Sequence, residues 1–189
     1  MADSGRASAG RRWGWHQLDP EWAARLVAAT GVRPDELVLD VGAGTGALTA
    51  PLVAAGARVI AIELHPVRAA ALRRRFGDRV IVVRADATDL RLPTRPFRVV
   101  ANPPFGVTTA LLKRLLHPGS RMVRADLVLD GRVARRWTQS GAPGAGRWMR
   151  DFDAALGPTV PRRAFRPPPP IDARLLTVTR SRAPGFRRA

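Results

Sequence analysis

Residues 38–46 read Val-Leu-Asp-Val-Gly-Ala-Gly-Thr-Gly, a short apolar run that leads directly into three alternate glycines. The run from Glu36 to Val41 predicts a buried strand, and the glycines predict a tight turn before a helix over 47–55. A dinucleotide fingerprint would place its last glycine one residue later, with a pyrophosphate on the helix N-terminus. The turn at Gly42, Gly44 and Gly46 instead favours a nucleoside cofactor without phosphates.

The rest of the chain continues this alternation of strands and helices as far as Asp130. Further strands are expected at 58–62, 80–83, 97–101, 122–129 and 175–179, and helices at 20–29, 66–76 and 107–116. Such an order predicts an α/β fold, with a parallel sheet and helices on both faces. Beyond Asp130 the pattern weakens: residues 139–147, rich in Gly, Ala and Ser, are predicted to be a mobile loop, and Arg166–Pro170 extended backbone.

The charge balance indicates a nucleic-acid partner. The 189 residues include 32 Lys and Arg against 15 Asp and Glu, for a formal net charge of +17. There is no cysteine, and the three histidines lack metal-ligand spacing, so thiolate catalysis and a metal site are not expected. We find neither a secretory signal nor an apolar stretch of about 20 residues, and expect a cytoplasmic protein that does not contact a membrane.

Two acids follow successive strands beyond the glycine turn. Glu63 ends the second strand, where a carboxylate can accept hydrogen bonds from both hydroxyls of a ribose. Asp86 follows the third strand and can accept from an adenine amino group. Asp89, close by, is more typical of a turn or cap.

Residues 102–105, Asn-Pro-Pro-Phe, follow the fourth strand and carry the most specific signal. A conjugated amino group is a poor nucleophile because its lone pair is delocalised into the ring. Two acceptors, the Asn102 side-chain oxygen and a backbone carbonyl of the proline pair, would favour a pyramidal nitrogen with its lone pair aimed at a methyl donor. Phe105 can stack on an unstacked base. The combination predicts methyl transfer to an exocyclic nitrogen of a nucleobase.

With these motifs the sequence resembles the ribosomal RNA adenine N6-methyltransferases, specifically the Erm type that confers macrolide–lincosamide–streptogramin resistance, over roughly residues 11–180. The resemblance rests on residues 13–20 (Trp-Gly-Trp-His-Gln-Leu-Asp-Pro), 38–46, 62–63 (Ile-Glu), Asp86, 102–105 and 161–167 (Pro-Arg-Arg-Ala-Phe-Arg-Pro). It implies a Rossmann-like, S-adenosylmethionine-dependent methyltransferase fold with a seven-stranded, mostly parallel sheet. It also implies a short form, with a catalytic domain at 13–182 and no C-terminal helical domain, while the composition predicts a flexible basic arm at 1–12 and a frayed tail at 183–189.

The resemblance also assigns roles to individual residues. Asn102, Pro103 and Phe105 are the implied catalytic residues, and Phe165 is a second aromatic near the target base. S-adenosylmethionine contacts are implied at His16, Leu18, Gly42, Gly44, Glu63, Asp86 and Asn102. His16 stands where the family usually has an amide, and can still donate to the methionine carboxylate.

The implied partner is 23S ribosomal RNA, bound before full ribosome assembly by a monomer. Without a C-terminal domain, arginines of the arm and loops are expected to hold this RNA: Arg6, Arg11, Arg12, Arg135, Arg136, Arg162 and Arg163. Alternatives stay open. They are a housekeeping small-subunit rRNA adenine methylase, an amino-methyltransferase acting on DNA or on a protein glutamine, and a nucleic-acid-binding factor that has the fold without the activity.

Overall fold

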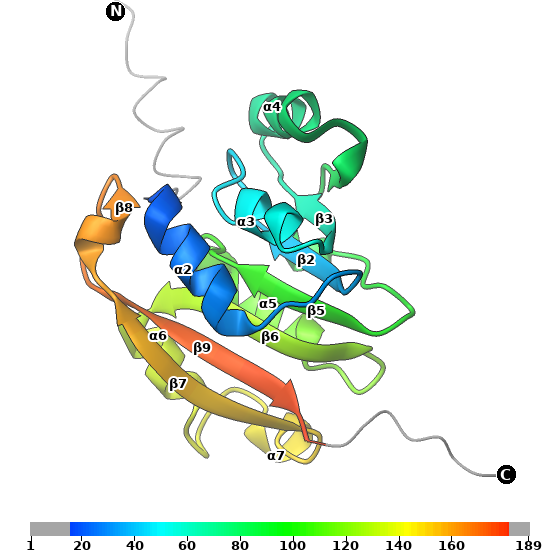
Figure 1. Cartoon of the computed structure of the whole chain (residues 1–189). Coiled ribbons are helices and arrows are strands. Elements are labelled where there is room, and N and C mark those ends of the chain that lie inside the picture. Colours follow the sequence, from blue (N-terminus) through cyan, green and yellow to red (C-terminus); the bar gives the residue numbers. More distant parts are fainter. Residues whose placement is uncertain (1–15, 182–189) are drawn as a thin grey trace, which may run out of the picture.

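A computed structural model describes residues 16–181 and shows a twisted sheet of seven strands with helices on both faces (Figure 1). The strand order is β4-β3-β2-β5-β6-β9-β7, and β9 alone runs opposite to the other six strands. This confirms the predicted α/β class and the seven-stranded, mostly parallel sheet. The strands are β2 (Leu37–Val41), β3 (Arg58–Ile62), β4 (Val80–Val83), β5 (Phe97–Ala101), β6 (Met122–Asp130), β7 (Phe152–Val160) and β9 (Ala173–Arg180).

The helices form two layers because alternate strand residues face opposite sides of the sheet. Val38, Val59 and Val100 pack beneath helices α2, α3 and α4, whereas Leu39 and Val99 belong to the core beneath α5, α6 and α7. The helices are α2 (Pro20–Thr30), α3 (Thr49–Ala54), α4 (Pro66–Phe76), α5 (Thr108–Leu115), α6 (Gly131–Trp137) and α7 (Ala145–Trp148). None of the helices between residues 16 and 181 is long and apolar enough to cross a membrane.

Helix α2 illustrates how local sequence sets an element's limits. The Asp19 side chain accepts a hydrogen bond from Glu21 N at 3.0 Å, and Pro20 occupies the first helical position, where its missing N–H costs nothing. Gly31 ends the helix in the left-handed region, with φ 62°. These features confirm the predicted start and end of the helix.

The segment at 139–147 differs from the mobile loop predicted from its composition. It consists of turns that lead into α7, with Ala142, Ala145 and Trp148 buried. The ring of Trp148 packs 5.9 Å from that of Trp137 (centroid to centroid), and its Nε1 donates to Pro143 O at 3.2 Å. The apolar anchor lies just outside the Gly/Ala/Ser-rich window, so the composition of the window did not reveal it.

Three other elements were absent from the sequence-based interpretation. Helix α6 and strand β7 lie where the pattern weakens, and β7 is interrupted by a register shift between Leu156 and Thr159, which breaks its alternation. A separate two-stranded ribbon pairs β1 (Gln17–Leu18) antiparallel with β8 (Phe165–Arg166). This ribbon brings the N-terminal motif beside the proline-rich segment that follows β8.

Candidate active site

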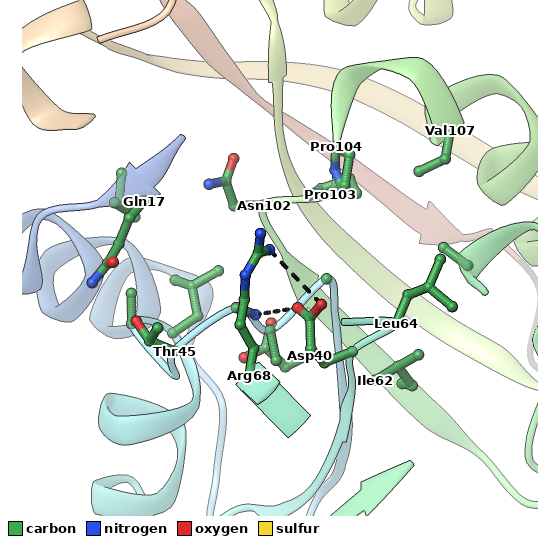
Figure 2. A pocket seen from close by; sticks show the side chains of 18 of the residues that line it. Gln17, Asp40, Thr45, Ile62, Leu64, Arg68, Asn102, Pro103, Pro104 and Val107 are labelled. Atoms are coloured by element: carbon green, nitrogen blue, oxygen red, sulfur yellow. Dashed lines mark hydrogen bonds and ion pairs between the residues drawn. The ribbon is translucent and has the colours of Figure 1, made fainter. Parts of the chain in front are cut away.

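A cavity of about 290 Å³ opens at the carboxyl ends of β2, β3, β4 and β5, where open α/β sheets commonly bind ligands. Side chains from the ends of all four strands and from β1 converge on it (Figure 2). The structure therefore brings together residues that are distant in the chain, such as His16 and Asn102, which are 86 positions apart. The predicted site residues that line the cavity are His16, Leu18, Gly42, Gly44, Glu63, Asp86, Asn102 and Pro103.

The glycine turn folds tightly over the end of β3. Gly42 N and Ala43 N both donate to Ile62 O, at 2.8 and 3.0 Å, and Gly42, Gly44 and Gly46 all have positive φ. A Cβ at position 42 would lie 3.0 Å from Cδ of Pro104. Gly42 thus allows the turn to approach the Asn-Pro-Pro loop closely, which the sequence alone did not indicate.

We expect the substitution Gly42→Ala to destabilise the fold by about 1–2 kcal/mol and to slow methyl transfer. The φ of 75° is unfavourable for alanine, and the new methyl group would push on Pro104. Urea unfolding and transfer kinetics measure the two effects. Gly31→Ala is the matched control, because Gly31 has a similar φ of 62° but open space around its missing Cβ. If both variants lost transfer activity equally, the contact with Pro104 would carry no weight.

Glu63 is 5% exposed and joins three parts of the site. Its Oε2 accepts from Gly44 N at 2.8 Å, its Oε1 accepts from His65 N at 2.8 Å, and Arg68 lies 3.8 Å from Oε1. Figure 2 shows the Arg68 side chain entering the cavity from α4. Each carboxylate oxygen has a second lone pair, so Glu63 can still accept from the hydroxyls of a bound ribose.

Asp86 follows β4 and stands exposed at the edge of the cavity. Its Oδ1 accepts from both the backbone N (2.8 Å) and the hydroxyl (2.7 Å) of Thr88, so Asp86 is the N-cap of the short helix η2 (Ala87–Asp89). The backbone hydrogen bond from Thr88 is the main reason why the pKa of Asp86 lies below its ordinary value. Asp86 is therefore an ionised acceptor whose Oδ2 can receive a hydrogen bond from a ligand amino group.

Asn102 is oriented by a backbone carbonyl that lies 86 positions earlier in the chain. Its Nδ2 donates to His16 O at 2.8 Å, so the amide oxygen points to the opposite side (Figure 2). Pro104 O accepts from Val107 N at 3.1 Å in the turn that follows, which leaves the Pro103 carbonyl as the second acceptor of the loop. The backbone of Phe105 begins the short helix η3 (Phe105–Val107), directly after the proline pair; its stacking role stays a prediction.

His16 holds this arrangement in place from the β1–β8 ribbon. Its Nδ1 donates to Pro167 O at 2.9 Å, while its backbone oxygen receives the Asn102 bond. Leu18 is 1% exposed and forms part of the cavity wall. His16 lines the cavity, and its contact with a methionine carboxylate stays a prediction.

Phe165 does not reach the cavity, in contrast to the implied position near the target base. Its side chain is fully buried in the core beside Leu18 and Ala164, and it is not among the residues that line the site. Its backbone pairs with Leu18 in the β1–β8 ribbon, so burial of the ring fixes the ribbon instead of presenting an aromatic face. In this structure Phe165 lies in the core and pairs with Leu18, which forms part of the cavity wall.

The predicted RNA-binding arginines fall into three groups. Arg135 and Arg136 are exposed on α6, and Arg162 and Arg163 are exposed on the short helix η4 (Arg162–Ala164) just before β8. Arg162 Nε donates to Pro169 O at 2.8 Å. The third group, Arg6, Arg11 and Arg12, lies outside the described residues, as do the arm at 1–12 and the tail at 183–189. In the part of the chain that is described, no three His, Asp or Glu side chains gather in a way that could hold a metal ion.

Asp40 also lines the cavity, a role that its place in the glycine motif did not predict. It is 1% exposed and its Oδ2 accepts from Thr49 Oγ1 at 2.6 Å. Burial is the main cause that raises its pKa from the ordinary 3.8 to about 7, and the negative charge of Glu63 adds to the effect. An acid within the apolar run that leads into the glycine turn was the sequence signal that could have identified Asp40 as a site residue.

The raised pKa of Asp40 predicts a pH dependence of stability. The folded state binds more protons than the unfolded state between about pH 4 and 7, so the free energy of unfolding should fall as pH rises through this range. The difference corresponds to roughly 4 kcal/mol at most, at 1.4 kcal/mol per pH unit. Urea unfolding of wild type and Asp40→Asn from pH 4 to 8 measures it. Equal slopes in both proteins would contradict the assignment to Asp40.

Comparison with known proteins supports the same chemistry. A family model described as "Ribosomal RNA adenine dimethylase" matches residues 14–185. The mycinamicin-resistance protein MyrB of Micromonospora griseorubida is 38% identical over 167 residues, covering 85% of this chain and 51% of MyrB. The ribosomal RNA small subunit methyltransferase A of Thermosynechococcus vestitus is 36% identical over 178 residues, covering 86% and 66%.

Among solved structures, the 23S rRNA methyltransferase ErmE is similar with a TM-score of 0.76 and 29% sequence identity. That match covers 90% of this chain and 71% of the ErmE chain. The chain spans only about half the length of the curated relatives it matches first.

Proposed function

The chain belongs to the ribosomal RNA adenine dimethylase family, and from this membership we propose that it transfers methyl groups from S-adenosylmethionine to the exocyclic N6 of an adenine in 23S ribosomal RNA. The consequence would be resistance to macrolide, lincosamide and streptogramin B antibiotics. The observation that carries the proposal is the orientation of Asn102, whose amide oxygen is left to accept because its Nδ2 is bound to His16 O.

The residues of the cavity fit S-adenosylmethionine by their chemistry. Glu63 offers acceptor oxygens for ribose hydroxyls, and Asp86 offers one for the adenine amino group. The backbone of the turn from Gly42 to Gly44 leaves room beside them, since neither glycine carries a side chain. The cofactor would supply an electrophilic methyl group.

The chain's own part in the reaction is to position and polarise the amino group. The Asn102 oxygen and the Pro103 carbonyl would each accept one N6 hydrogen, which favours a pyramidal nitrogen with an available lone pair. Neither group has to move during the reaction, because His16 O and the proline pair fix them beforehand. The methylated nitrogen then has a proton to lose, and the exposed mouth of the site can pass it to water.

A second candidate is methylation of small-subunit rRNA, and the similarity to small subunit methyltransferase A favours it. The resistance reading is supported by the higher identity to a mycinamicin-resistance protein and by the similarity to the 23S methyltransferase ErmE. The predicted partner state, RNA not yet assembled into ribosomes and bound by a monomer, also belongs to this proposal.

Transfer of a tritiated methyl group to purified rRNA tests both candidates directly. The protein is incubated with protein-free 23S rRNA, protein-free 16S rRNA, 50S subunits and 30S subunits, and primer extension locates the modified adenines. We expect incorporation into protein-free 23S rRNA above all other substrates. Incorporation only into 16S rRNA or 30S subunits would establish the small-subunit alternative, and none into any RNA would refute the proposed activity.

A further inference from the structure

A second cavity, of about 920 Å³, lies on the side of α5 that faces the 88–94 segment. It is a groove bounded by that segment, by the last turns of α5 and by the turn at 117–121. Thr88 lines this groove, whereas Asp86 and Ala87, just before it, line the candidate active site. The two cavities are therefore neighbours across η2.

The described residues that line the groove include cations and no acid, and the acid of the bounding segment, Asp89, pairs with Arg114. Lys113, the only lysine of the chain, and Arg121 are both exposed there. Arg114 is held differently: it donates to Leu90 O and lies 3.5 Å from Asp89, so it fastens the wall of the groove. The ligand-facing charge thus rests mainly on Lys113 and Arg121.

Two further contacts shape the part of the groove that presents these cations. The pKa of Arg180 lies below its ordinary value, chiefly through burial; the negative charge of Asp151 opposes this shift, and the positive charge of Arg121 adds to it. Arg180 in turn donates to Met122 O and Ser120 O, which fixes the turn that presents Arg121. His117 Nδ1 accepts from Gly119 N at 3.1 Å, which leaves Nε2 as the ring nitrogen that can donate to a ligand.

We propose that this groove binds the phosphates of single-stranded RNA next to the adenine that enters the active site. The inference rests on the proposed function and adds a place for the substrate's backbone. Helix α5 links the two cavities, with Val107 before its first turn in the active site and Lys113 near its end in the groove. Its eight residues span roughly 12 Å, a short distance for a flexible RNA strand.

RNA fits the groove better than an acidic peptide does. Leu90, Leu92 and Pro93 provide an apolar wall beside the cations, which suits ribose and base surfaces that follow a phosphate. The position beside the active-site cavity, across η2, also suits a ligand that continues into the active site. An acidic peptide is the competing occupant, and the experiment below includes it.

The test measures binding of a fluorescent 12-nucleotide adenosine RNA by anisotropy across a salt series. The double variant Lys113→Ala/Arg121→Ala is compared with wild type and with Arg58→Ala/Arg74→Ala, which removes two exposed cations from β3 and α4 instead. We expect the groove variant to lower the slope of log K against log salt by about 1.4 and the affinity at 0.15 M salt roughly tenfold. The control should change both quantities much less, and Lys113→Arg should retain wild-type binding.

Two further measurements separate this inference from the proposed function. Binding of S-adenosylmethionine, followed by calorimetry, should be unchanged in the groove variant, which excludes misfolding. If wild type methylates 23S rRNA but the groove and control variants bind RNA equally, the groove inference is wrong and the function stands. If wild type methylates no RNA yet the slope falls as expected, the groove stands and the function is wrong. Displacement of the RNA by polyglutamate at equal charge concentration would overturn the assignment to RNA.

Discussion

The substitution Asn102→Ala should lower kcat for methyl transfer by about 10²–10³-fold, the range observed when one preorganised hydrogen-bonding group is removed from an active site. Alanine removes the oxygen that would accept an N6 hydrogen, and it also removes the donor to His16 O. Single-turnover transfer to protein-free 23S rRNA measures the loss, since it isolates the chemical step from product release.

Asn102→Asp is the matched control for these two roles. A carboxylate keeps an acceptor for the amino group but faces His16 O with a second oxygen, so it can no longer donate there. We expect its rate to fall between those of wild type and Asn102→Ala. A rate for Asn102→Ala within threefold of wild type would show that the amide does not orient the target. Equal rates for the two variants would show that the bond to His16, and not the acceptor, is what matters.

The parts of the fold that sequence predicted correctly depend on local rules. Pro20 and Gly77 mark helix limits because their backbone preferences act within a few residues. The ends of β2, β3, β4 and β5 meet at one edge of a parallel sheet, so Glu63, Asp86 and Asn102 could be placed in one site from the strand order alone.

The parts that were missed depend on contacts between distant segments. The pairing of Leu18 with Phe165 joins residues 147 positions apart, and it buries the aromatic ring that family resemblance places at the substrate. Likewise the bond from Asn102 to His16 O uses a backbone carbonyl, which no residue type at position 16 could reveal. The same loss of local signal concealed β7, where a register shift interrupts the alternation of an edge strand.

Glu63→Ala should weaken S-adenosylmethionine binding by about 1–3 kcal/mol and should also destabilise the fold. The carboxylate is expected to accept from the ribose, but it already satisfies the buried Gly44 N–H and the His65 N–H. Removing the carboxylate leaves both donors without this acceptor. The free energy of unfolding should therefore fall by roughly 1–3 kcal/mol, the cost of a buried unsatisfied group. Titration calorimetry and urea unfolding measure the two effects.

Asp86→Ala provides the comparison that separates binding from folding. Asp86 is exposed and its side-chain hydrogen bonds go to Thr88, so its loss should lower the free energy of unfolding less than the loss of Glu63 does, while weakening cofactor binding by a similar 1–3 kcal/mol, roughly. Glu63→Gln adds a second comparison, because its one amide oxygen can keep Gly44 or His65 but not both. Unchanged affinity in both alanine variants would contradict the assignment of the cavity to S-adenosylmethionine. A different outcome would be a loss of affinity in Glu63→Ala alone, in proportion to its loss of stability. That result would mean that Glu63 shapes the turn without touching the ligand. If the carboxylate does bind the ribose, its removal must lower affinity by more than the loss of folded protein explains.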